Sequence, residues 1–242
     1  MKKVQLSIMA MLLFGAVACV KNNSAIHLNG NVSNAEAADM VAASVNGVAD
    51  LADDATVNAT FFATAHPTCG TVKSDTISRH SPAGSFATYN YNSTYNFVVN
   101  CVNNQPDNLS SNLAYNGNFS NQNFSSTSSG SSAFTVTGLA PAATNFVING
   151  EYKRSGSFNS KIDTSNHGNH NVDIVINGLT VRRPARTIAS GTAATSVTGY
   201  VHGKGSFSYT GTLVFNGDGT AKLTLNGTVY LINLVTGQKT KE

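Results

Sequence analysis

The chain has 242 residues, of which 11% are charged, and its formal net charge is +3. Average soluble domains are about 25% charged, so amides and hydroxyls supply most of the polarity here. The small charge excess argues against nucleic-acid binding, and the 41% hydrophobic content excludes a disordered chain because it is enough to bury a core.

The first predicted element is an export signal. Lys2 and Lys3 precede an apolar run from about Val4 to Val20, which is short for a membrane-spanning helix of about 20 residues. The sequence GAVAC at 15–19 resembles the lipobox of bacterial lipoproteins, although alanine stands at 16 where leucine is usual.

The lipobox resemblance implies cleavage after residue 18 and acylation of Cys19. We therefore expect a signal peptide over 1–18, a lipid-anchored tether over 19–33, and one folded domain over 34–242. The alternative is ordinary secretion, with cleavage near Ala18 and no lipid.

The cysteine count supports the lipidated form. Three cysteines are an odd number, which needs an explanation in an exported protein. If Cys19 carries lipid, Cys69 and Cys101 remain as a pair, and we expect a disulfide between them in an oxidising envelope.

A helix is predicted over 34–52. Ser33 or Asn34 can cap its N-terminus, and Glu36 suits the positive end of the helix dipole. Apolar residues from Ala37 to Val48 recur every three or four positions, which predicts one buried face. Such a helix needs a partner, and the sheet that follows it in the sequence is the one available.

The segment around this helix and the rest of the chain carry opposite charges. Residues 22–54 hold five acids and no lysine or arginine, whereas residues 55–242 hold twelve basic and seven acidic residues. The acidic segment either docks on the basic body or is a separately solvated face, and the sequence leaves both possibilities open.

From about Thr56 onward the pattern has a period of two, which predicts an antiparallel sheet. Asn-Gly pairs begin at residues 116, 149, 177, 216 and 226, and this dipeptide favours hairpin turns. The pair at 216 is the clearest turn, whereas others, such as the pair at 149, are alternatively bulges inside long strands. Three polar stretches are expected to be loops: 125–132, 163–171 and 184–195.

Three clusters are weak candidates for a site. His167 and His170 are metal-ligand types, but their Gly- and Asn-rich surroundings favour a plain polar loop, so no metal site is predicted. The second cluster is a basic patch of Arg182, Arg183 and Arg186, suited to anionic glycan or lipid headgroups. Its alternative is a solvated strand end.

Tyr89 and Tyr91 belong to the densest aromatic stretch and form the third cluster. Aromatic rings on a sheet face stack on sugars, but the chain has no tryptophan, and packing against the helix is the ordinary alternative. The sequence shows neither a nucleophile-elbow motif nor a metalloprotease motif, and no cofactor is predicted.

These observations predict a mainly β protein: a single antiparallel meander, as a curved sheet, sandwich or open barrel, with one N-terminal amphipathic helix packed on it. In architecture this resembles periplasmic lipoprotein carriers with an open barrel and a helical lid. We therefore expect a non-catalytic, membrane-anchored lipoprotein of the outer membrane with a structural or binding role, and the resemblance implies a lipid or other hydrophobic ligand. The alternatives are a glycan-binding or adhesion module and a hydrolase without a recognisable motif.

Overall fold

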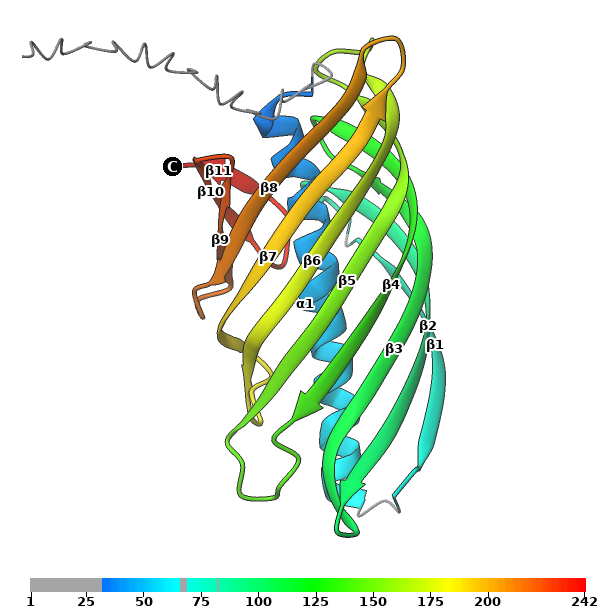
Figure 1. Cartoon of the computed structure of the whole chain (residues 1–242), viewed down its shortest axis with the longest axis vertical. Helices are drawn as coiled ribbons and strands as arrows, with labels where there is room; N and C mark the ends of the chain where they lie inside the picture. Colours follow the sequence, from blue (N-terminus) through cyan, green and yellow to red (C-terminus); the bar gives the residue numbers. More distant parts are fainter. Residues whose placement is uncertain (1–31, 66–68, 82) are drawn as a thin grey trace, which may run out of the picture.

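The computed structural model describes residues 32–65, 69–81 and 83–242; the expected signal peptide, Cys19 and most of the tether lie outside them. The described part consists of one helix, α1 (Asn34–Ala65), and one sheet of eleven strands (Figure 1). The strands are β1 (Val72–His80), β2 (Thr88–Val102), β3 (Gln105–Ser120), β4 (Phe124–Thr137), β5 (Asn145–Ser160), β6 (His167–Arg182), β7 (Ile188–Val201), β8 (Gly205–Phe215), β9 (Thr220–Leu225), β10 (Thr228–Asn233) and β11 (Lys239–Lys241).

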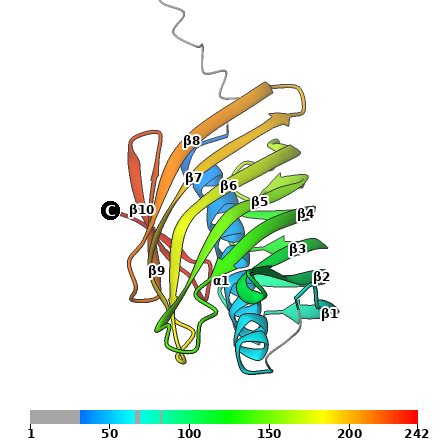
Figure 2. The ribbon, with the colours of Figure 1, turned by 60° about the horizontal axis from the view of Figure 1, so that its bottom comes forward.

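The sheet is a simple antiparallel meander in which each strand pairs with the next one in sequence. It curves around α1, and among the described residues β1 and β11 end the sheet without pairing with each other (Figure 2). We call this shape an open half-barrel. The predicted fold class is therefore confirmed, and among its variants the open, curved sheet is the one observed.

Two of the Asn-Gly pairs form turns, as predicted. Asn216-Gly217 connects β8 to β9, and Asn226-Gly227 connects β9 to β10 with φ of 43° and 79° at its two residues. Such positive φ values favour asparagine and glycine over other residues. The pairs at 149 and 177 lie at register shifts in β5 and β6, which are bulges, and the pair at 116 lies inside β3.

The loop predictions were partly wrong. Residues 125–132 lie inside β4, the predicted loop at 163–171 ends where β6 begins at His167, and the one at 184–195 ends where β7 begins at Ile188. A strand with both neighbours in place gains its ladder hydrogen bonds whatever its side chains are. The serines of β4 therefore extend the sheet despite the lack of apolar residues.

Helix α1 is also longer than predicted, because it ends at Ala65 rather than at 52. Ala55, Ala59 and Phe62 continue its buried face through this second half. The hydroxyl of Thr60 bonds the carbonyl four residues before it, which satisfies this polar side chain within the helix.

The sheet wraps α1 so closely that the first half of the helix is buried on every side. All residues from 36 to 46 are buried, whereas the sequence pattern predicted a single buried face. α1 contacts β3 to β7 on one side and β9 to β11 on another. Alanine is frequent on α1, and its small side chain permits this close approach.

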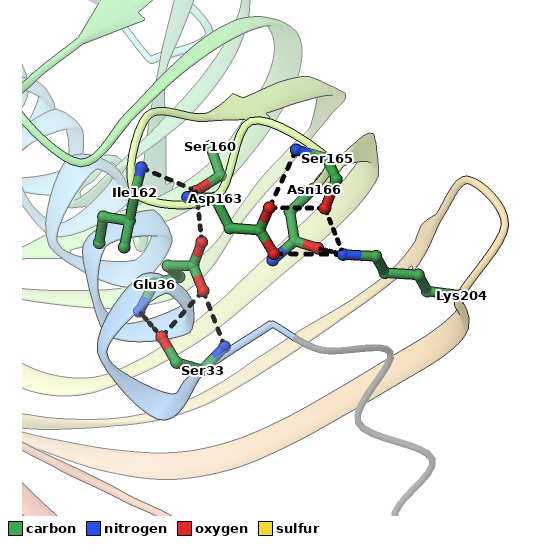
Figure 3. A network of polar contacts seen from close by, with 8 residues as sticks. All are labelled: Ser33, Glu36, Ser160, Ile162, Asp163, Ser165, Asn166 and Lys204. Atoms are coloured by element: carbon green, nitrogen blue, oxygen red, sulfur yellow. Dashed lines mark hydrogen bonds and ion pairs between the residues drawn. The ribbon is translucent and has the colours of Figure 1, made fainter.

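The N-terminus of α1 is held by a capping box (Figure 3). The Glu36 N–H donates to Ser33 Oγ at 3.1 Å, and the Ser33 N–H donates to Glu36 Oε2 at 2.9 Å, so Ser33 is the cap of the two predicted alternatives and Glu36 completes the box. Ser160 at the end of β5 donates to the other oxygen of Glu36. The start of the helix is thereby fastened to the sheet.

The acidic segment does dock on the basic body. Asp39 pairs with Lys239 at 3.1 Å, and Asp53 pairs with Arg186 at 3.6 Å.

Within residues 32–65, 69–81 and 83–242, no helix is long and apolar enough to cross a membrane.

Candidate functional site

A polar network joins the middle of α1 to the first two strands. Asp54 accepts hydrogen bonds from the Arg79 guanidinium of β1 and from the Tyr95 hydroxyl of β2. Burial raises the pKa of Asp54, and the bonds from Tyr95 and Arg79 oppose that effect. The two hydrogen bonds occupy both carboxylate oxygens of Asp54 and tie α1 to the β1–β2 edge of the sheet.

Several tyrosines of the sheet lie under α1. Tyr89 and Tyr91 stack with ring centroids 5.9 Å apart, and Tyr91 meets Tyr115 edge to face. The Tyr115 hydroxyl donates to the Tyr152 hydroxyl at 2.7 Å. Tyr115 and Tyr152 are buried against the helix, whereas Tyr89 and Tyr91 are half-buried.

A small cavity remains between α1 and these tyrosines. It measures about 30 Å³ and is lined by Gly47, Asp50, Leu51, Arg79, Tyr91, Ser93, Tyr95, Tyr115 and Tyr152. One ordered water needs roughly 10–15 Å³ on such a measure, so the cavity has room for a water or a small ion. Asp50 is the one carboxylate among its lining residues.

A much larger groove opens on the other side of Asp50. It has a volume of about 660 Å³, which lies in the usual range of 300–1,000 Å³ for ligand pockets. Its walls come from α1, β2, the β6–β7 and β8–β9 connections and the segment after β10. The lining residues are Ala49, Asp50, Ala52, Asp53, Tyr89, Val181, Arg182, Arg186, Thr187, Ile188, Gly217, Asp218, Gly219, Leu234 and Val235.

Asp50 has the most perturbed carboxyl of the groove. Burial is the main cause that raises its pKa to about 6, helped by the charges of Asp54 and Asp53 and opposed by Arg79. A carboxyl with this pKa, placed between a groove and an inner cavity, is the type of group that marks binding sites. It is protonated in part near neutral pH.

The predicted arginine patch is divided in the structure. Arg182 and Arg186 line the groove, together with Tyr89 from the aromatic cluster. Arg183 instead donates two hydrogen bonds of 3.0 Å to the carbonyls of Gly138 and Ala140, and its guanidinium lies 4.5 Å from the Phe146 ring centroid. Arg183 therefore has a structural role.

The two histidines do not come together. His167 is exposed and stacks on His202, whereas His170 faces the helix and is 1% exposed. They are three residues apart on one strand, so their side chains leave opposite faces of the sheet. In the part of the chain that the structure describes, no group of three His, Cys, Asp or Glu residues is placed to hold a metal.

Cys69 and Cys101 form the expected disulfide, with their Cα atoms 5.7 Å apart. It connects the segment between α1 and β1 to the end of β2. Because Cys69 follows the helix end by four residues, the bond holds the C-terminal end of α1 near the sheet.

Sequence reasoning missed several residues of this region, notably Asp50, Arg79 and Arg154. Arg154 had a usable signal. Along β5 it lies in phase with Tyr152 and Phe158, so a charged residue interrupts the buried side of an alternating strand. Asp50 and Arg79 had no such signal, because only the packing of α1 on β1 brings them together.

The fold and the groove define an open half-barrel with a single helix inside it and a ligand-sized groove beside that helix. Comparison of this chain with protein-family models, with curated proteins and with solved structures finds no match. Any function must therefore be argued from the groove and its chemistry.

Proposed function

We propose that this chain is an anchored envelope lipoprotein that binds a small amphipathic molecule in the groove beside α1. The single observation that carries the proposal is the groove of about 660 Å³, in which apolar and charged walls meet. Predominantly apolar walls with a few convergent polar groups are the usual composition of small-molecule sites. The role is binding rather than catalysis.

The walls indicate the chemistry of the ligand. Val181, Ile188 and Leu234 offer apolar surface to a hydrocarbon part. Arg182 makes no ion pair with any described residue, whereas Arg186 is already paired with Asp53. We therefore expect an acidic headgroup to pair with Arg182, since guanidinium matches carboxylate and phosphate geometry.

The sequence supports the proposed location of the protein at a membrane of the cell envelope. The lipobox-like GAVAC at 15–19 places an acylated Cys19 only a short tether away from the start of α1. A soluble ligand-binding domain held at a membrane by such a tether is suited to capture envelope lipids or their fragments. Cell-envelope, outer-membrane localisation is part of the same proposal.

Binding is tested by titrating the full, membrane-extracted chain with dansyl-labelled undecanoic acid and following dansyl fluorescence. We expect saturable binding. Arg182→Ala should weaken it about tenfold, which corresponds to roughly 1.4 kcal/mol. Ala49→Trp, which fills the groove from α1, should abolish it. The matched control is Lys222→Ala, a basic residue outside the groove that pairs with Glu242 and should leave binding unchanged.

Absence of saturable binding, or equal affinity in all four proteins, contradicts the binding proposal. The anchor is tested separately by the intact mass of the extracted protein. Loss of residues 1–18 with an added diacyl or triacyl group is expected, and an unlipidated mass contradicts the anchor alone.

A further inference from the structure

Arg154 is fully buried between the sheet and α1, with 1% of its surface exposed. It lies on β5, and its side chain is on the concave face that covers the helix, in phase with Tyr152 and Phe158. A buried arginine is rare unless a carboxylate accompanies it. The partners of Arg154 therefore decide what this residue does.

All partners of Arg154 are neutral. Its Nε donates to Ser128 Oγ at 2.9 Å and its Nη2 to Ser126 Oγ at 3.2 Å. The rings of Tyr91 and Phe119 lie 5.9 and 5.7 Å from the guanidinium carbon, which is the outer limit for a cation–π contact. Within the described residues, Nη1 has no hydrogen-bond partner.

No side-chain carboxylate of the described residues forms an ion pair with Arg154. The sequence contains twelve Asp and Glu residues, and all twelve lie in the part that the structure describes. Six of them form ion pairs with Arg79, Lys153, Arg186, Lys204, Lys222 and Lys239, and none pairs with Arg154. A guanidinium does not lose its proton inside proteins, so the positive charge stays.

Asp50 is the carboxyl that borders the same tyrosines, and it does not act as the counter-charge. The cation that interacts with Asp50 is Arg79.

Further incompletely satisfied polar groups share this concave face. The Tyr91 hydroxyl lies beside Ser128 and Arg154 without a hydrogen bond of good geometry. Neither ring nitrogen of His170, one of which is a donor and the other an acceptor in the neutral imidazole, has a hydrogen-bond partner among the described residues. The strand register places them around Arg154: Tyr91 and Ser128 lie in one row across the sheet with His170, through Gly117 and Gly156. Burial, and then the charge of Arg154, keeps His170 neutral by lowering its pKa to about 3.

We propose that Arg154, with Tyr91 and His170 as further hydrogen-bond donors, binds a small anion between α1 and the sheet. The buried guanidinium presents a positive charge and a free N–H, the Tyr91 hydroxyl presents an O–H, and the neutral imidazole of His170 presents one N–H. An anion can accept from all three groups at once, which removes the large cost of an unpaired buried charge. This site is separate from the groove and does not depend on the proposed function.

The space next to this cluster limits the size of the anion. Tyr91, Tyr115 and Tyr152 interact electrostatically with Arg154 and also line the cavity of about 30 Å³, whose lining does not include Arg154 or His170. A chloride ion fits such a space, as does the terminal carboxylate or phosphate oxygen of a longer molecule. These two sources share one chemistry and differ in what remains attached to the charge.

The first measurement is the anion content of the full chain after exhaustive exchange into chloride-free buffer. Acid-released inorganic anions are quantified by ion chromatography, and an organic extract is examined by negative-ion mass spectrometry. In parallel, thermal unfolding is followed while chloride is added at constant ionic strength. Arg154→Met removes the charge at similar volume, and Lys153→Met is the matched control on the exposed face of the same strand.

The native protein is expected to carry an anion in amounts equal to protein, or to show a saturable rise of Tm with chloride. Lys153→Met should behave in the same way and Arg154→Met should show neither effect. An inorganic ion identifies an internal structural anion, whereas an organic acid identifies the headgroup of a bound molecule. If the native protein holds no anion and its Tm does not respond specifically to chloride, the proposal is overturned, even if Arg154→Met does not fold.

Discussion

The hydroxyl of Tyr152 lies directly beneath Gly47, so closely that a Cβ added at position 47 would come within 2.8 Å of it. Gly47 is in the middle of α1, where glycine normally costs about 1 kcal/mol relative to alanine. Tyr152 is held in place by burial and by its hydrogen bond with Tyr115. The glycine is thus required by the contact between helix and sheet.

We predict that Gly47→Ala lowers the free energy of unfolding by about 1–2 kcal/mol, because overpacking outweighs the gain in helix propensity. In a Tyr152→Phe background the hydroxyl is gone, and the same substitution should be neutral or stabilising. Urea unfolding of the four proteins measures this coupling. An equal effect of Gly47→Ala in both backgrounds would show that the contact is not what selects glycine.

Asp54 and Asp53, which are neighbours on α1, should differ greatly in their contributions to the free energy of unfolding. The Asp54 side chain is 9% exposed and is bonded by Arg79 and Tyr95, so Asp54→Asn leaves a buried donor and a charge unpaired. We expect a loss of about 3 kcal/mol in unfolding free energy. Asp53→Asn breaks only the exposed pair with Arg186 and should cost less than about 1 kcal/mol. Similar values for the two variants would contradict this assignment.

Asp50 should make the fold less stable as pH rises. Its pKa is raised from 3.8 to about 6 in the folded state, so the folded protein binds the proton more tightly than the unfolded chain. Stability from this group is therefore highest below pH 4 and is lost between about pH 4 and pH 6, by at most about 3 kcal/mol.

The Asp50→Asn variant isolates this effect, because Asp39 and Asp54 titrate in the same direction and remain in both proteins. The difference in unfolding free energy between variant and native protein should grow in favour of the variant from pH 4 to pH 7. Asp75→Asn, on the exposed edge strand β1, serves as the control for loss of an exposed carboxylate. A difference for Asp50→Asn that stays constant from pH 4 to pH 7 would refute the prediction.

Reduction of the Cys69–Cys101 disulfide should lower the free energy of unfolding by about 3–4 kcal/mol, given a sequence separation of 32 residues. The measurement compares urea unfolding with and without dithiothreitol. A Cys69→Ser, Cys101→Ser double variant should already have the lower stability and should not respond to dithiothreitol. If thiols appear on reduction without any loss of stability, the bond does not constrain the unfolded chain as expected.

Local patterns in the sequence were enough to predict the class of fold. The N-cap at Ser33 or Asn34, the period-two alternation and the Asn216 and Asn226 turns depend on interactions between residues close in sequence. The cysteine pair followed from counting alone. These features predicted one helix packed on one antiparallel meander, with the helix start and two hairpins correctly placed.

The site was decided only by tertiary structure, because it depends on strand register and on the curvature of the sheet. The serine run at 125–132 becomes a strand since β3 and β5 supply its hydrogen bonds. Curvature around α1 brings Tyr89 of β2 to the same groove as Arg182, about ninety positions away in the sequence. This second relationship is present in no local pattern, since the two residues meet only when the helix fills the half-barrel.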